Sequence, residues 1–355
     1  MIFRSTLTLF LALTGIAVAG PPIIDPVVLL DKGATVNFVF EDDRPFKSCH
    51  ASTIVQTESG DILAAWFAGT GEKNPDVAIY IARYSNGKWG PLDTKVKVNE
   101  TAHWNPVFFR DPRSGIHLFF KVGPEIPHWQ TYWITSTDDG KTWSEATELV
   151  PGDNGGRGPV KNKPILLQDG TWLAGASTEL DGWKPFADRS DDFGKTWTRS
   201  DDIEIDRKVI RGKGAIQPTL WEYEKNKIRG FFRTTGKVIG RSDSNDGGKT
   251  WSPLKPSGLP NNNSGVDVLQ LEGGRLILVY NPVARNWGSR SPLNLAVSHD
   301  NGETWKDFAS LESEKGKEFS YPAIIKTNDG IAISYTWKRK RVRVWNIPMT
   351  ALQGI

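Results

Sequence analysis

Six polar residues stand at the starts of successive predicted strands, and their side chains are types that bind sugars or move protons. They fall in equivalent register along the chain: His50, Asn105, Lys163, Gln217, Asp267 and Tyr321. A single polar residue at a strand start is usually a hydrogen-bonded edge residue. Six of them in one register instead indicate a shared ring of donors and acceptors. Such a ring suits a polyhydroxylated ligand.

Other kinds of site find less support in the sequence. One cysteine, Cys49, rules out a thiolate cluster. No Gly-rich loop follows a strand and opens a helix, and no Gly-x-Ser-x-Gly motif occurs. The five histidines lack ligand spacing; they are residues 50, 103, 117, 128 and 299. We therefore expect neither a metal nor a cofactor.

The elements that position these residues are predicted from a repeat. The octapeptide from Ser136 to Trp143 has the pattern Ser-x-Asp-x-Gly-x-Thr-Trp, and its copies begin at Ser190, Ser244 and Ser298, always 54 residues apart. The Asp can accept backbone N–H groups inside a tight turn, Gly supplies a positive φ, and Trp packs beneath the turn. A period this regular predicts a repeat architecture.

Strand pairs of similar composition recur between these turns. Six of them occur at a spacing of 50 to 58 residues, and no stretch has the pattern of a long amphipathic helix. This arrangement predicts an all-β, six-bladed β-propeller. We expect the last blade to take its third strand from residues 341–347 and its fourth from residues 35–40, which would close the ring. No linker divides the chain, so residues 20–355 form one predicted domain.

The repeated turn is the Asp-box, or BNR, repeat, and the chain resembles the sialidase-like β-propellers that contain it. The resemblance covers nearly all of the chain after its first residues. It implies that the boxes lie on the blade periphery, away from a central substrate site. It also implies a role for individual residues of this sequence.

By that resemblance, the general acid is Asp76, in Glu72-Lys-Asn-Pro-Asp76, and the nucleophile is Tyr321, in Phe319-Ser-Tyr-Pro. Arg290, eight residues before the last box, matches one arginine of a three-arginine clamp on the substrate carboxylate. Arg233 or Arg241 is a candidate for a second arginine.

Two positions depart from the family pattern. His50 stands where the first clamp arginine is expected, and His cannot copy the bidentate geometry of a guanidinium. Gln217 stands where a Glu activates the tyrosine, and Gln cannot take a proton. Catalysis through Tyr321 would then need another carboxylate, such as Asp267 or Glu179, although Glu179 is otherwise typical of a solvated loop residue.

Three hypotheses about function follow from the resemblance. The first is an exo-glycosidase acting on terminal, acidic sugars of glycans, with Asp76, Tyr321 and Arg290 in the roles above. The second is a uronic-acid lyase, in which His50 and Tyr321 serve as base and acid of a β-elimination. The third is a glycan-binding propeller without catalysis, which Gln217 favours.

The N-terminal residues and the net charge predict where the protein is located and which partners it has. An apolar run from Leu7 to Val18 ends at Ala17-Val18-Ala19, which predicts a signal peptide over residues 1–19 and a secreted, extracellular protein. The formal net charge is +3, and the basic run from Lys338 to Arg343 alternates with apolar residues like the solvent face of a last strand. We therefore expect a glycan partner, no nucleic acid, no membrane and a monomer.

Overall fold

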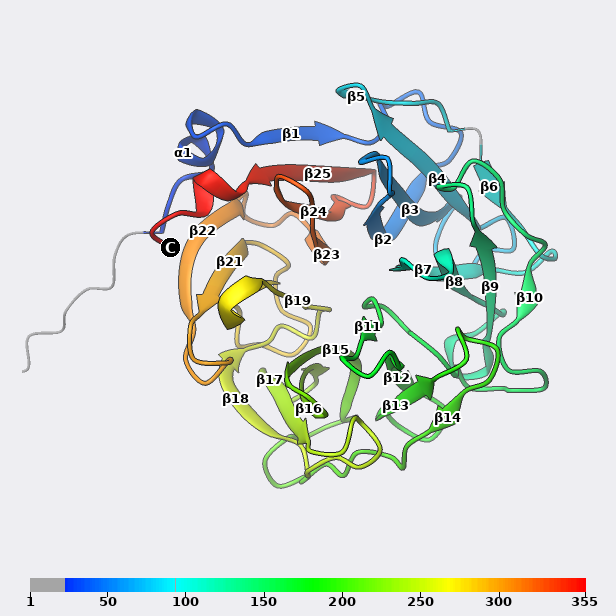
Figure 1. The fold of residues 1–355 in the computed structure, drawn as a ribbon, viewed down its shortest axis with the longest axis vertical. Coiled ribbons are helices and arrows are strands. Elements are labelled where there is room, and N and C mark those ends of the chain that lie inside the picture. The colour runs from blue at the N-terminus through cyan, green and yellow to red at the C-terminus, as the bar shows by residue number, and fades with distance from the viewer. Residues whose placement is uncertain (1–22, 93) are drawn as a thin grey trace, which may run out of the picture.

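Six β-sheets surround a central axis in the computed structural model (Figure 1), which describes residues 23–92 and 94–355. The first blade contains β2 (Ser48–Gln56), β3 (Ile62–Gly69), β4 (Ala78–Ser85), β5 (Lys88–Trp89) and β6 (Thr94–Val96). The second contains β7 (His103–Asp111), β8 (Gly115–Val122), β9 (Gln130–Ser136) and β10 (Thr147–Glu148). The third contains β11 (Ile165–Leu166), β12 (Trp172–Thr178), β13 (Lys184–Ser190) and β14 (Thr198–Arg199).

The other three blades complete the ring. The fourth contains β15 (Ala215–Glu224), β16 (Lys227–Thr234), β17 (Val238–Ser244) and β18 (Lys255–Pro260). The fifth contains β19 (Asp267–Gln270), β20 (Leu276–Tyr280), β21 (Leu293–Ser298) and β22 (Lys306–Glu312). The sixth contains β23 (Phe319–Lys326), β24 (Gly330–Trp337), β25 (Arg341–Pro348) and β1 (Thr35–Phe38). The helices are short: α1 (Pro26–Asp31), η1 (Ile126–His128), η2 (Glu272–Gly274) and η3 (Met349–Leu352).

The predicted six-bladed propeller and its closure are confirmed. β1 pairs with β25 in antiparallel register, with Thr35 opposite Asn346 and Phe38 opposite Arg343. The blue and red strands therefore lie side by side in Figure 1. The predicted signal peptide, residues 1–19, lies outside the described residues. Among the residues that are described, no helix is long and apolar enough to cross a bilayer.

The apolar core lies between neighbouring blades. Every residue of β3, the second strand of the first blade, is buried, because both faces of this strand meet other sheets. One cluster joins Leu295 of the fifth blade to Ile324 of the sixth, and another joins Ala64 of the first blade to Val344 of the sixth. Full burial of each such aliphatic side chain stabilises the fold by roughly 1.5–3 kcal/mol. The blades are thus held together by faces that no single sheet could bury alone.

The Asp-box turns join the third strand of a blade to its outermost strand, on the rim. In each box the Asp carboxylate accepts the backbone N–H and the hydroxyl of the Thr four residues later; at Asp246 these distances to Thr250 are 2.9 and 2.6 Å. The Ser hydroxyl accepts the Gly N–H, as from Gly248 to Ser244 at 2.9 Å. The predicted peripheral position of the four boxes is confirmed.

The inner strands of four blades have a bulge near their start. The ladder register shifts there in β2, β7, β15 and β23. The residue at the bulge has a positive φ in every case: 55° at Ala51, 39° at Asn105, 57° at Gln217 and 53° at Tyr321. A left-handed conformation costs a non-glycine residue about 1–3 kcal/mol and re-aims its side chain. In the first blade Ala51, not His50, occupies the equivalent backbone position.

Candidate active site

A cavity of about 350 Å³ lies where β2, β7, β15 and β23 begin, at one mouth of the central channel. Residues from all six blades border it. They are His50, Glu72, Lys73, Trp104, Asn105, Ile126, Trp129, Glu179, Trp183, Gln217, Arg233, Trp287, Arg290, Tyr321 and Arg339. The sequence-predicted residues that meet here are His50, Asn105, Gln217, Arg233, Arg290 and Tyr321.

Tyr321 lies at the centre of the hydrogen bonding in this cavity. Its side chain is nearly buried, and Arg233 donates from Nη1 to the phenolic oxygen at 2.5 Å. Gln217 donates to the same oxygen from Nε2 at 3.1 Å. Both neighbours are donors, and one is a cation, so the arrangement stabilises negative charge on that oxygen. The bulge at Tyr321 is what places the phenol beside these partners.

The orientation of the Gln217 amide is fixed by its second contact. Its Oε1 accepts from Arg233 Nη1 at 3.2 Å. An arginine can only donate, so the amide oxygen must face Arg233 and the NH₂ group must face Tyr321. Gln217 therefore supports the phenolic oxygen as a donor and leaves the phenol's own proton without an acceptor there.

Three guanidinium groups, Arg233, Arg290 and Arg339, border the cavity. Glu318 holds two of them: its Oε1 accepts from Arg290 Nη1 at 2.6 Å and from Arg339 Nε at 2.8 Å. Burial alone would raise the pKa of Glu318, but the charges of Arg290 and Arg339 hold it below its ordinary value. The carboxylate is thus ionised and orients the two cations. Arg233 is oriented by Asn263, whose Oδ1 lies 2.8 Å from Nε.

Arg339 was not recognised from the sequence. It lies in the turn between β24 and β25, where Lys338 and Arg339 both have a positive φ, 55° and 58°. The turn is closed by the Lys340 N–H, which donates to the Trp337 carbonyl at 3.0 Å, and two successive central residues with positive φ are normally Asn or Gly. The basic run from Lys338 to Arg343 resembled a solvated face, but this turn brings Arg339 to the cavity. The unusual residues in a tight hairpin were the available signal.

His50 is buried and contributes no positive charge to the site. Burial lowers the pKa of His50 well below its ordinary value, and the nearby charges of Arg339, Arg290, Arg233 and Lys161 act in the same direction. Its Nδ1 lies 2.8 Å from Thr336 Oγ1, and its ring packs 4.2 Å from that of Tyr321. A neutral imidazole therefore replaces the expected cation, and Arg339 supplies a guanidinium beside it.

Two carboxylates border the cavity. Glu72 accepts from Arg339 Nη1 at 2.7 Å. Glu179, directly after β12, is half-buried, and burial raises its pKa although the charge of Arg233 opposes the shift. The sequence suggested that Glu179 is a solvated loop residue, but the structure brings it to the mouth.

Asp76 does not border the cavity. It is exposed, and its carboxylate accepts from Thr70, with the backbone nitrogen at 2.7 Å and the hydroxyl at 2.8 Å. Partial burial acts in the opposite sense, but the bonds from Thr70 lower the pKa of Asp76. Asp76 thus closes the loop that brings Glu72 and Lys73 to the cavity, and its environment is the opposite of that expected for a general acid.

Lys163 and Asp267 lie away from this mouth. Their side chains form an ion pair, 2.9 Å from Nζ to Oδ2. Lys163 borders a different cavity formed at the ends of β2, β7 and β23, and therefore at the opposite mouth of the channel. The inner strands of their blades, β11 and β19, lack the bulge described above. Their side chains therefore do not reach this mouth, although their positions in the sequence are equivalent.

Arg241, the alternative to Arg233, also lies elsewhere. Its guanidinium makes two bonds to Glu303 on the rim, at 2.6 and 2.8 Å. Arg233 is therefore the second arginine at the mouth.

Aromatic side chains form much of the cavity wall. Trp104 and Trp129 are almost fully buried, whereas Trp287 is 65% exposed at the outer edge. The Arg233 guanidinium lies 5.0 Å from the Trp183 ring and 5.7 Å from the Trp287 ring. Indole faces beside charged groups can stack against the apolar face of a sugar ring while the charges meet its substituents.

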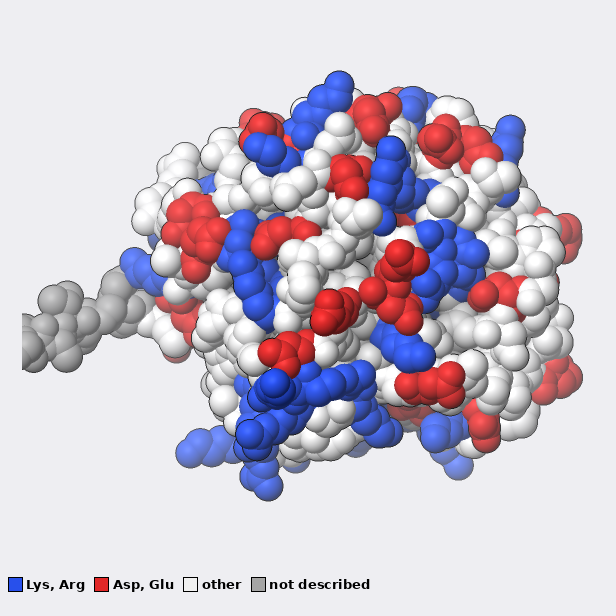
Figure 2. Space-filling model, turned by 90° about the horizontal axis from the view of Figure 1, so that it is seen from below, with Lys and Arg blue, Asp and Glu red and all other residues white. Residues whose placement is uncertain are grey.

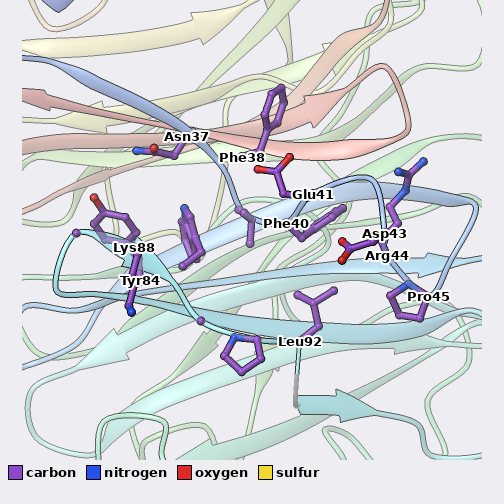
Figure 3. Close-up of a pocket in the computed structure, with 15 residues that line it drawn as sticks. Asn37, Phe38, Phe40, Glu41, Asp43, Arg44, Pro45, Tyr84, Lys88 and Leu92 are labelled. Carbon is purple, nitrogen blue, oxygen red and sulfur yellow. The ribbon is translucent and has the colours of Figure 1, made fainter.

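Another cavity, of about 580 Å³, lies on the rim between the β1–β2 loop and the β4–β5 hairpin, lined by Phe40, Tyr84 and Leu92 among others (Figure 3). Two of its charged groups, Glu41 and Arg44, have partners on the rim: Arg341 lies 3.1 Å from Glu41, and Arg44 lies 2.6 Å from Asp42. We therefore place the candidate active site at the channel mouth.

Charge is mixed on the outer surface. On the side seen in Figure 2, Lys and Arg side chains are interspersed with Asp and Glu. Within residues 23–92 and 94–355, no group of three or more His, Cys, Asp or Glu residues has the geometry of a metal site.

Comparisons with known proteins agree with this fold. The model of the BNR repeat-like domain matches residues 60–333. The structure is similar to that of a protein of unknown function from Dyadobacter fermentans, with 16% identity, a TM-score of 0.70, and coverage of 89% of this chain and 99% of the other. A search of curated proteins found no match.

Solved sialidases are similar as well. The Hadza microbial sialidase Hz136 has 16% identity and a TM-score of 0.72, with coverage of 87% of this chain and 68% of the other. The sialidase of Trypanosoma rangeli bound to the inhibitor DANA has 15% identity and a TM-score of 0.69, with coverage of 90% of this chain and 60% of the other. These likenesses show the fold, and the chain spans about three fifths of the trypanosomal protein.

Proposed function

Because this chain belongs to the BNR repeat-like domain family of sialidase-like propellers, we propose that it is a secreted glycoside hydrolase that removes terminal acidic sugars from glycans. One observation carries the proposal. The phenolic oxygen of Tyr321 is held by Arg233 and Gln217 in a cavity that Arg290 and Arg339 also border. A polarised nucleophile and three cations together suit a sugar that carries a carboxylate.

The cations and the nucleophile have separate tasks in this proposal. Arg290 and Arg339, held by Glu318, pair with the sugar carboxylate through charge-assisted hydrogen bonds. Arg233 stabilises the charge that develops on the phenolic oxygen. Tyr321 attacks the anomeric carbon as the bond to the leaving oxygen breaks, and water then releases the sugar from the tyrosine. Tyrosine nucleophiles are known exceptions to the two-carboxylate pattern of glycosidases.

The test is a comparison of aryl glycosides of sialic acid, glucuronic acid and glucose. We expect turnover of an acidic glycoside and little turnover of the glucoside. The Tyr321→Phe variant should lose at least about 1,000-fold in kcat, since the nucleophile is removed. Tyr280→Phe is the matched control, because Tyr280 bonds to Asp307 in the fifth blade, outside the cavity. Full activity of Tyr321→Phe would overturn the proposal.

A second candidate function is supported by the contact of His50 with Tyr321. Their rings lie 4.2 Å apart, and the lowered pKa of His50 leaves a neutral imidazole that can accept a proton. These two groups could serve a β-elimination on a uronic acid, as in a lyase. The product would then absorb ultraviolet light through its new double bond. Hydrolysis without such absorbance would exclude this reading, and unchanged glycan with tight binding would favour a propeller that only binds.

A further inference from the structure

Tyr321 needs a proton acceptor that its immediate neighbours do not provide. Arg233 and Gln217 both donate to the phenolic oxygen. Within the part of the chain that the structure describes, no protein oxygen accepts the phenolic proton. A phenol attacks a carbon centre efficiently only when a base removes that proton.

Most nearby carboxylates are committed to other partners. Asp267 accepts from Lys163, from Thr219 Oγ1 at 2.8 Å and from the Ile324 backbone at 2.9 Å. Glu318 accepts from two arginines and from Ser320. Glu72 is bonded to Arg339. These carboxylates hold structure or cations and are poor bases, because taking a proton would break their ion pairs.

Glu179 differs from them in position and environment. It directly follows the last residue of β12, and it borders the same cavity as Tyr321, Gln217 and Arg233. No ion pair to Glu179 exists among the described residues. Burial raises the pKa of Glu179, while the charge of Arg233 and a hydrogen bond from Trp183 oppose that shift. General bases are most effective when their pKa approaches the working pH.

We infer that Glu179, on the third blade, is the catalytic base that accepts the proton of Tyr321, directly or through one water. This inference rests on the proposed glycosidase function. In the first step Tyr321 Oη bonds to the anomeric carbon, the phenolic proton moves to Glu179, and the bond to the leaving oxygen breaks while that oxygen takes a proton from water, which leaves a hydroxide. In the second step the hydroxide attacks the anomeric carbon, the bond to Tyr321 Oη breaks, and the phenolic oxygen recovers its proton from Glu179.

The test separates activation of the nucleophile from protonation of the leaving group. Glu179→Gln is compared with the wild type on an aryl glycoside, whose leaving group needs no proton, and on an unactivated disaccharide of the same acidic sugar. We expect kcat to fall by about 100-fold or more on both. Loss on the disaccharide alone would make Glu179 a general acid and would overturn its role as the base.

Two further variants make the result specific. In Glu179→Gln combined with Gln217→Glu, a carboxylate stands beside Tyr321 again, and we expect at least about tenfold recovery of kcat over Glu179→Gln. Glu224→Gln is the matched control, since it makes the same replacement at an exposed glutamate that pairs with Lys227 outside the cavity. It should stay within about threefold of the wild type. Thermal melting and binding of a non-hydrolysable glycoside check that each variant is folded.

The outcomes distinguish a failure of the role of Glu179 from a failure of the proposed glycosidase function. If the wild type turns over an acidic aryl glycoside and Glu179→Gln stays within threefold of it, the role of Glu179 is wrong and the proposed function stands. If the wild type turns over no acidic glycoside at all, the proposed function fails, and the role of Glu179 fails with it.

Discussion

At the rim, four turns repeat the same Ser, Asp, Gly, Thr and Trp, whereas at the channel mouth four blades share the same bulged backbone and each carries a different residue there. The distance from the box Asp to the Thr nitrogen is 2.9 Å in all four turns, at Asp138, Asp192, Asp246 and Asp300. The bulged positions instead carry Ala51, Asn105, Gln217 and Tyr321.

The difference lies in where each group finds its partners. The Ser, Asp and Thr side chains that all boxes share bond within their own turn, whereas the variable positions of a box also reach the neighbouring blade, as Glu303 does to Arg241. At the mouth, by contrast, Tyr321 of the sixth blade is held by Arg233 and Gln217 of the fourth. The repeated residues therefore form the scaffold, and the residues that differ between equivalent positions of the blades form the site.

Among variants that contrast the mouth with the rim, the largest effect is expected at Arg233. The Arg233→Met variant should lower kcat on an acidic aryl glycoside by about 100- to 1,000-fold, the usual effect of removing one donor to a developing negative charge. Arg241→Met removes a rim arginine bonded to Glu303 and should leave kcat unchanged. Steady-state kinetics of both variants make the comparison. Equal losses in the two would erase the distinction between mouth and rim.

Replacement of Arg339 should have a smaller effect, on the affinity for negatively charged ligands. Arg339→Met should weaken binding of an acidic glycoside by roughly 10- to 100-fold, because one charge-assisted hydrogen bond is lost. Binding of the corresponding neutral glycoside should hardly change. Calorimetric titration measures both affinities, and a similar loss for the neutral ligand would show that Arg339 acts only on the structure of the cavity.

At the rim, the effect should be on stability. Asp246→Asn weakens two hydrogen bonds with Thr250 and places an amide NH₂ group against backbone donors. We expect the free energy of unfolding to fall by about 1–2 kcal/mol with kcat unchanged. Urea unfolding followed by tryptophan fluorescence gives the first quantity. A loss of kcat at full stability would show that the boxes take part in the reaction.

The smallest expected effect is the response of the boxes to acid. Burial acts in the opposite sense, but hydrogen bonds from Thr304 and Ser298 lower the pKa of Asp300 to about 2. The unfolded carboxyl titrates at about 3.9 and so binds more protons between these values. The contribution of Asp300 to stability is present above about pH 4 and is lost as pH falls toward 2. Asp300→Asn should flatten this part of a plot of urea midpoint against pH, and an unchanged slope would contradict the assignment.

The same comparison explains how much the sequence could predict. The blades, the rim boxes and the closure by residues 35–40 followed from a period of 54 residues, because a repeated local motif has a repeated local structure. The equivalent register correctly predicted that the side chain faces the channel mouth where the strand is bulged, as at Gln217 and Tyr321. The same prediction was wrong at Lys163 and Asp267, because the inner strands of their blades lack the bulge.

Other site residues could not be found from spacing. Arg339 and Glu72 are 267 positions apart, and only the closed ring brings them within 2.7 Å. Glu318 becomes recognisable only when Arg290 and Arg339 are seen around it. Asp76 matched the family pattern in sequence, but its own loop captures the carboxylate through Thr70. Contacts between distant segments and local competition for a side chain are not encoded in a spacing.

The pairing of β1 with β25 also sets an order of events during synthesis. Phe38 and its partner Arg343 are separated by about 300 residues, which take roughly 15–60 s to synthesise at 5–20 residues per second. Through that interval β1 has no partner strand, while the first five blades can already form. The ring closes only after the last blade emerges, so a ribosome that stalls in the final strands leaves both ends of the sheet array open. Those open edges would be the parts of the nascent chain most in need of a chaperone.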